Sequence, residues 1–189
     1  MRILLGITGA SGSLYAVRLI KNLCAGDHEV HLIVTHSGEE VIAHECSAEA
    51  AQLTAWVHRR YDVNDMGAAV ASGSFPMEAM VIVPCSMKTA ACIAHGISDN
   101  LLTRAADVTL KEGRPLLLVP RETPMSAIHL ENLLHLSRAG AIVLPACPAF
   151  YHRPQTIEDL ADMLTGKILD VLHIENQLFS RWPLKEAQM

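Results

Sequence analysis

Short apolar runs, each followed by a helix-like pattern, constrain the fold of this chain more than any other feature. Their nearly continuous Val, Ile and Leu content is typical of strands that are covered on both faces. The runs are Ile3–Ile7, Val30–Val34, Ala79–Val83, Pro115–Val119 and Ala141–Leu144. This alternation predicts an α/β fold with three layers, in which a mostly parallel, doubly wound sheet lies between two layers of helices.

Helix signals between the runs support this interpretation. Thr123 and Pro124 together predict the start of one helix, and Gly140 predicts its end. A second helix is expected over Thr156–Leu172, whereas residues 47–76 give the weakest pattern and predict one short helix. Because the chain has 189 residues and shows no linker or low-complexity tract, we expect a single domain over residues 1–189.

The first apolar run ends abruptly in the turn Thr8–Gly12, and a helical pattern starts directly after it. The free N–H groups of a helix N-terminus attract an anion, and glycine lets the backbone approach a ligand closely. The glycine spacing G-x-x-G-x-x-G differs from both the dinucleotide fingerprint and the Walker loop. The second run ends in Thr35-His36-Ser37, without the acid that holds the ribose of NAD. The turn is therefore either an ordinary structural β–α turn or a site for a mononucleotide such as FMN.

Composition argues against several classes of partner. The net charge is −5 and the basic residues are scattered, which argues against a nucleic-acid-binding surface. No apolar run approaches the length of a membrane span, and the first residues lack the pattern of a signal peptide. The 5 cysteines form no CxxC pair and the 10 histidines form no known metal motif. We therefore expect no metal, and a reduced protein in the cytoplasm.

Polar residues follow each apolar run, and the carboxyl ends of parallel strands meet at one edge of a sheet, where ligands bind. This convergence favours a binding site there. Ser86 is placed to cap a helix, and Lys88 in the first turn of that helix opposes its dipole unless an anion is bound. Arg121 and Glu122 follow a buried run directly. They either pair with neighbours or, as we favour, bind an anion and transfer a proton.

Other polar residues have simple structural alternatives. Arg104 and Asp107 are spaced as an i, i+3 ion pair on a helix. The Thr89 hydroxyl either bonds to the backbone or contacts a ligand. Tyr151 follows a proline-rich turn, where it either packs as a lid or offers its hydroxyl to a phosphate. Single charges on helices, such as Glu45, are exposed to solvent by default.

A series of motifs runs through nearly the whole chain: GITGASG (6–12), SGSF (72–75), PCSMKT (84–89), DNLLTRAADV (99–108), LVPRETP (118–124), IHLEN (128–132) and AFYHRPQ (149–155). In this order they resemble the flavin prenyltransferases, the UbiX family that partners the aromatic-acid decarboxylases. The resemblance implies a Rossmann- or flavodoxin-like subunit of a homo-oligomer, typically a dodecamer. It implies metal-independent transfer of the dimethylallyl group of dimethylallyl phosphate to N5 and C6 of reduced FMN. Prenylated FMN then serves a separate UbiD-type decarboxylase.

The resemblance also implies the site residues. The flavin would be held by Gly9, Ala10, Ser11, Thr35, Ser86, Met87, Lys88, Thr89 and Arg121. The phosphate of the prenyl donor would meet Lys111, Arg121, Tyr151 and Lys167. Ser11, Glu45 and Glu122 would be catalytic, with Ser11 and Glu122 handling protons at N5 and C6, and Arg104 is a further site residue. Lys167 departs from the family, in which arginine is common, because a lysine lacks the bidentate fork that arginine offers to phosphate.

Two other functions stay open. FMN-dependent decarboxylases that act on cysteine share this fold and a similar Pro-x-Ser-x-x-Thr loop, but they typically use a catalytic histidine. His36, His95 and His129 are available for that role, although the Arg-Glu-Thr-Pro and Phe-Tyr-His-Arg-Pro motifs argue against it. The other alternative is a non-catalytic FMN-binding subunit of a decarboxylase, which would not need the cations expected around a second phosphate.

Overall fold

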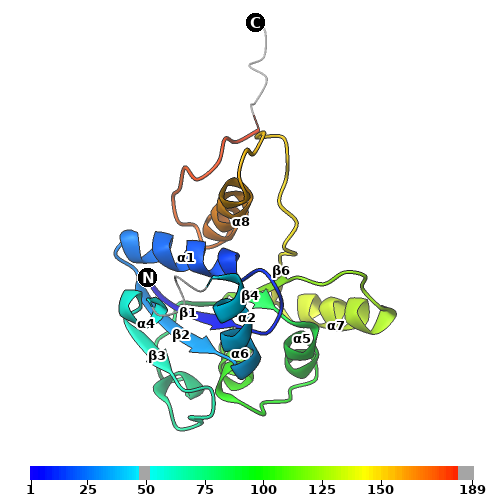
Figure 1. Ribbon diagram of the computed structural model, residues 1–189. Coiled ribbons are helices and arrows are strands. Elements are labelled where there is room, and N and C mark those ends of the chain that lie inside the picture. The colour runs from blue at the N-terminus through cyan, green and yellow to red at the C-terminus, as the bar shows by residue number, and fades with distance from the viewer. Residues whose placement is uncertain (47–51, 183–189) are drawn as a thin grey trace, which may run out of the picture. The chain divides into compact units, whose positions relative to one another are not determined.

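The computed structural model describes residues 1–46 and 52–182 and is shown in Figure 1. The chain divides into two compact units, Met1–Ala146 and Cys147–Met189. Each unit is described by itself. The expected single domain over 1–189 stays a prediction.

The first unit is built on a six-stranded sheet in the order β3-β2-β1-β4-β5-β6, and every neighbouring pair is parallel. The strands are β1 (Arg2–Ile7), β2 (Glu29–Val34), β3 (Arg59–Tyr61), β4 (Ala79–Cys85), β5 (Leu116–Pro120) and β6 (Ile142–Val143). This is the strand order of the Rossmann fold, with the reversal between β1 and β4. The predicted doubly wound parallel sheet is therefore confirmed.

Helices of the first unit lie on both faces of this sheet (Figure 1). They are α1 (Ser13–Ala25), α2 (His36–Glu45), α4 (Leu53–Trp56), α5 (Met87–Ala94), α6 (Leu101–Lys111) and α7 (Ala127–Arg138), with a 3-10 turn η1 (Ala69–Ala71). Helix α1 contacts β2 and β4, and α2 and α4 pack against α1. Helices α5 and α6 contact β5, and α7 packs against α5. Alternate residues of the strands pack on the α5–α6 side, for example Leu4, Met80 and Leu116.

Two details differ from the sequence predictions. Strand β3 was not predicted, because it has only three residues and two of them are the exposed Arg59 and Arg60. The helix expected from Thr123 and Pro124 begins instead at Ala127. Ser126 caps it by accepting a hydrogen bond from the His129 N–H, and the His129 ring accepts one from the Ser126 N–H. This reciprocal pair satisfies two backbone donors, so the first turn forms there.

The second unit contains α8 (Ile157–Val171). Thr156 caps this helix and forms a capping box with Asp159, whose carboxylate also accepts the Gln155 N–H. The helix predicted over Thr156–Leu172 is thereby confirmed to within one residue at each end. Within the residues that the structure describes, no helix is both long and apolar enough to cross a bilayer.

Candidate active site

A buried threonine joins the two loops at the point where the strand order reverses. The Thr8 hydroxyl, 1% exposed as a residue, donates to the Pro84 carbonyl at 2.7 Å and accepts from the Ser86 N–H at 2.8 Å. The turn after β1 and the turn after β4 are therefore held together by one side chain. In open α/β sheets this crevice is where ligands bind.

A cavity of about 510 Å³ opens at this edge of the sheet. Its lining residues come from the segments that follow β1, β2, β3 and β4, including the first turns of α2 and α5, and from the segment before α6: Gly9, Thr35, His36, Ser37, Val63, Asn64, Ser86, Lys88, Thr89, Asp99 and Asn100. Gly9 lets the turn after β1 approach the start of α2 closely, because a Cβ at this position would lie 2.5 Å from the Ser37 Cβ. The predicted residues Gly9, Thr35, Ser86, Lys88 and Thr89 thus share one cavity.

Two helices begin at the cavity wall. Thr35 caps α2 by accepting from the Gly38 N–H at 3.1 Å, and Ser86 caps α5 by accepting from the Thr89 N–H at 3.3 Å. The Ser86 hydroxyl also contacts the Thr89 hydroxyl at 3.1 Å. The predicted N-cap role of Ser86 is confirmed. The N-terminal ends of both helices contribute partial positive charge to the cavity.

Lys88 and Met87 occupy the first turn of α5. The Lys88 ammonium lies 3.5 Å from the Asp99 carboxylate, and its side chain is 75% exposed. An exposed pair of this kind contributes little to stability, so the lysine is free to move toward an anion in the cavity. Met87 is buried as the first residue of the helix.

The N-terminus of α1 already holds a carboxylate. Gly12 has a φ of 113°, a left-handed conformation that favours glycine. The Glu45 carboxylate, from the end of α2, accepts the N–H groups of Gly12 and Ser13 at 2.9 and 2.8 Å. Burial opposes ionisation of Glu45, but hydrogen bonds from Ser11, Gly12 and Ser13 outweigh it and hold the pKa of this carboxyl below its usual value. Glu45 is exposed, as expected by default, yet it has a defined structural partner.

Arg121 reaches the same turn from the loop after β5. Its Nε donates to the Ser11 carbonyl at 3.0 Å. The neighbouring Glu122 carboxylate accepts the Thr123 N–H at 3.0 Å. Of the predicted residues, Ser11, Glu45 and Arg121 therefore meet at one turn, and Ala10 lies buried within it.

A third group lies along α6. Arg104 pairs with Asp107 at 2.8 Å, which confirms the expected i, i+3 ion pair, and also donates to the Ala71 carbonyl at 3.2 Å. Lys111 pairs with Glu112. A Cβ on Gly73 would lie 3.0 Å from the Lys111 ammonium, so the loop that follows η1 packs closely on this lysine.

Tyr151 and Lys167 belong to the second unit. The Tyr151 ring packs edge-on against Trp182 at 5.4 Å between centroids. The Lys167 ammonium lies 3.7 Å from Asp170, which Arg181 holds with two hydrogen bonds of 2.7 and 2.9 Å. The Arg181 guanidinium is the main reason that the pKa of Asp170 is lowered.

Sequence reasoning did not single out Val63, Asn64, Asp99 or Asn100 of the cavity lining, and it considered His36 only as a histidine available to the decarboxylase alternative. Val63 and Asn64 follow β3, the strand that was too short and too charged to be predicted. His36 and Ser37 were visible as polar residues after an apolar run, and Asp99 and Asn100 as part of a motif. Their place in the lining depends on how α2 and α6 approach the edge of the sheet.

Comparison with known proteins identifies the family. The family model described as Flavoprotein matches residues 1–181. Flavin prenyltransferase LpdB of Lactiplantibacillus plantarum is 54% identical over 182 residues, covering 96% of this chain and 97% of the relative. The crystal structure of AnUbiX (PadA1) in complex with FMN and dimethylallyl pyrophosphate matches with a TM-score of 0.95 and 42% identity over 98% of each chain. The structure of a dodecameric FMN-dependent UbiX-like decarboxylase from Escherichia coli O157:H7 matches with a TM-score of 0.94 and 41% identity, covering 97% of this chain and 100% of that one. The chain has the expected Rossmann- or flavodoxin-like fold, and it belongs to the flavoprotein family and, within it, to the UbiX-type flavin prenyltransferases.

Proposed function

We propose that residues 1–189 act as one flavin prenyltransferase domain, which joins the dimethylallyl group of dimethylallyl phosphate to N5 and C6 of reduced FMN without a metal. The observation that carries this proposal is the cavity at the reversal of strand order, which has hydroxyl groups and two helix N-termini in its wall. Similarity over nearly the full chain to a protein that holds FMN and dimethylallyl pyrophosphate supports it.

The donor groups of the cavity fit the phosphate of FMN. Thr35, Ser86 and Thr89 bring hydroxyl groups, Lys88 brings a cation, and both helices bring free N–H groups. The N–H groups of Gly12 and Ser13 already bind the Glu45 carboxylate, so the α1 N-terminus has less to offer a second anion. We therefore place the phosphate near α2 and α5, and the flavin ring near Gly9, Ala10, Ser11 and Arg121.

Reduced FMN supplies the nucleophilic atoms, and the chain supplies charge to the leaving group. The bond between the allylic carbon and the phosphate oxygen breaks as the carbon bonds to N5, so negative charge grows on the phosphate. Cations that are already in position stabilise that charge and lower the barrier. We assign this role to Lys111, Arg121 and Lys167, with the Tyr151 hydroxyl as a hydrogen-bond donor to the same phosphate, and we assign Arg104 to supporting the site. The Lys167 ammonium binds phosphate as a point charge.

N5 loses its proton when it bonds to the allylic carbon, and closing the new ring joins C6 to one carbon of the prenyl double bond, so the other carbon gains a proton while C6 loses one. Ser11 and Glu122 are our candidates for proton transfer at N5 and C6. Glu45 supports this chemistry by holding the turn that carries Ser11, through its bonds to Gly12 and Ser13.

We further propose a homo-oligomer, with twelve copies as in the similar dodecameric structure. Helix α7 exposes Ile128, Leu130 and Leu134 at 68%, 55% and 48%, a run of large apolar side chains suited to burial against another copy. A UbiD-type decarboxylase is the proposed recipient of the product. Cys24, Cys85, Cys92 and Cys147 are free thiols in the described part of the chain, in keeping with a reduced, cytoplasmic location.

The test is anaerobic incubation of the protein with reduced FMN and dimethylallyl phosphate, followed by mass spectrometry of the extracted flavin. We expect the flavin mass to rise by one prenyl unit. An unchanged flavin that is still bound would favour a non-catalytic FMN-binding subunit. Release of carbon dioxide from a cysteine-terminated peptide would favour the decarboxylase alternative.

A further inference from the structure

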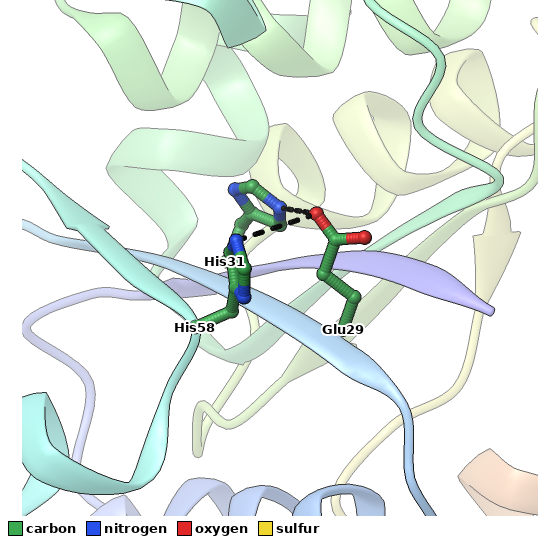
Figure 2. Close-up of side chains that lie close together, drawn as sticks. All are labelled: Glu29, His31 and His58. Carbon is green, nitrogen blue, oxygen red and sulfur yellow. Dashed lines mark hydrogen bonds and ion pairs between the residues drawn. The ribbon is translucent and has the colours of Figure 1, made fainter.

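A cluster of metal-ligand side chains lies at the other end of β2, away from the cavity. Glu29 and His31 are two residues apart on this strand and so project from the same face. His58 directly precedes β3, which pairs with β2 through His31 and Arg59. Figure 2 shows the three side chains gathered around one carboxylate oxygen of Glu29.

The three groups lie at distances that suit a shared metal ion. The Nε2 atoms of His31 and His58 lie 2.9 and 3.7 Å from the Glu29 Oε1, and all three ligand atoms lie within 4.8 Å of one another. Zinc binds nitrogen and oxygen at about 2.0–2.2 Å, so ligand atoms around it lie roughly 3.3–3.6 Å apart in a tetrahedron. Small side-chain shifts would bring these atoms to that spacing. The His58 side chain is 62% exposed, which leaves the cluster open to ions from solution.

Neighbouring side chains orient these ligands from behind. The other ring nitrogen of His31, Nδ1, contacts the Tyr61 hydroxyl at 2.8 Å, and the His31 residue is only 2% exposed. Arg2 Nε donates at 2.8 Å to Oε1 of Glu29, the same oxygen that the His31 ring contacts, and so holds the carboxylate beside the two imidazoles. Such outer partners fix the ring and the carboxylate of typical metal sites.

We propose that Glu29, His31 and His58 form a binding site for a divalent transition metal, with Zn²⁺ as the preferred ion. Two imidazoles and one carboxylate leave a fourth position for water, a ligand set that zinc accepts. The bound ion would link β2 to the chain just before β3, a strand that pairs through only three residues. Glu29 begins β2, whereas the cavity lies beyond its other end at Thr35. The ion therefore has a stabilising role, and the transfer proposed for the cavity proceeds without it.

The test is calorimetric titration of the chelator-treated full chain with Zn²⁺ at neutral pH, together with the Co²⁺ absorption spectrum. We expect one Zn²⁺ per chain in wild type, and Co²⁺ bands of the intense, four-coordinate kind. His58→Ala should weaken the Zn²⁺ affinity at least about tenfold, because loss of a residue that only supports a metal ligand already weakens affinity by about that factor. His44→Ala is the matched control, because His44 is an exposed histidine in the last turn of α2, and it should bind as wild type does.

The thermal midpoint provides a second measurement. Excess Zn²⁺ should raise it in wild type and in His44→Ala, and much less in His58→Ala. If His58→Ala does not fold, Tyr61→Phe keeps all three ligands, removes the hydroxyl beside His31, and should weaken Zn²⁺ binding about tenfold. Equal affinity and stoichiometry in wild type and His58→Ala would overturn the proposal. The proposal would also be overturned if wild type bound no Zn²⁺. If His58→Ala cannot be made, wild-type Zn²⁺ affinity in Tyr61→Phe would overturn it.

Discussion

The Thr8 hydroxyl provides a direct test of how the cavity is assembled. Thr8→Val keeps the shape of a buried side chain but removes the bonds to Pro84 and Ser86. The part-buried Ser86 N–H loses its acceptor, which costs about 1–2 kcal/mol. The Pro84 carbonyl still accepts the Thr8 N–H at 3.3 Å, so losing the hydroxyl donor there costs about 0.5–1.5 kcal/mol. We expect the free energy of unfolding to fall by about 1.5–3.5 kcal/mol in total.

Urea unfolding at one fixed protein concentration measures this change, since the stability of an oligomer depends on concentration. Thr8→Ser is the matched control, because it keeps the hydroxyl and loses one buried methyl group, at a cost of about 1 kcal/mol. FMN titration of both variants should show weaker binding only for Thr8→Val, in which the Ser86 cap of α5 is no longer attached to the first turn. If Thr8→Val is as stable as Thr8→Ser and binds FMN equally well, the hydrogen bonds do not hold the two loops together.

Three further changes test the site. Gly9→Ala should weaken FMN binding in a titration, because its Cβ would lie 2.5 Å from the Ser37 Cβ; adding Ser37→Gly should restore it, and a double variant as weak as the single one would contradict this reason. Glu122→Gln should keep FMN binding but slow the formation of prenylated flavin; a wild-type rate would remove Glu122 from the catalytic set. Glu45→Gln should cost about 0.3–1 kcal/mol of stability at neutral pH, as expected for a charge lost at a helix N-terminus. Because the pKa of Glu45 is lowered by folding, its contribution is full above the usual carboxyl pKa and disappears as the pH falls through the lowered value. Urea curves of wild type and Glu45→Gln should therefore converge in acid, and a gap that stays constant would refute the argument.

Local patterns made much of the fold predictable. Continuous apolar runs marked all strands except β3, and β1, β4 and β5 are buried along nearly their whole length, so their sequences show no alternation of polar and apolar residues. Ser86 was predictable as a cap because capping depends on residues within one turn. The same rule misplaced the start of α7, where Thr123 and Ser126 are both suitable caps. The helix starts after Ser126, whose N–H donates to the ring of His129, three residues further on. The usual capping-box pattern has glutamate or glutamine at that position, so it does not predict this contact.

Contacts between distant parts of the chain were not predictable in this way. Thr8 bonds to groups 76 and 78 positions away, and Arg121 reaches Ser11 across 110 positions. Nothing near Thr8 or Ser11 in the sequence specifies these partners, because they depend on which strands become neighbours in the sheet. The resemblance named Ser11 and Arg121 as site residues but did not supply the contact that joins them.

The contact of Glu45 changes how the first turn is interpreted. In the sequence, Thr8–Gly12 was an anion-friendly turn, and its helix N-terminus was the natural place for a phosphate. In the structure the Glu45 carboxylate accepts the first N–H groups of α1, and hydrogen bonds at this turn outweigh burial and lower the pKa of Glu45. A second anion at the same end would meet this negative charge at close range. The N-termini of α2 and α5 begin instead with Thr35 and Ser86, which are uncharged caps in the wall of the cavity. We therefore propose that the charge of the chain itself separates the two tasks, with phosphate binding at α2 and α5 and the Ser11 turn left for the flavin ring.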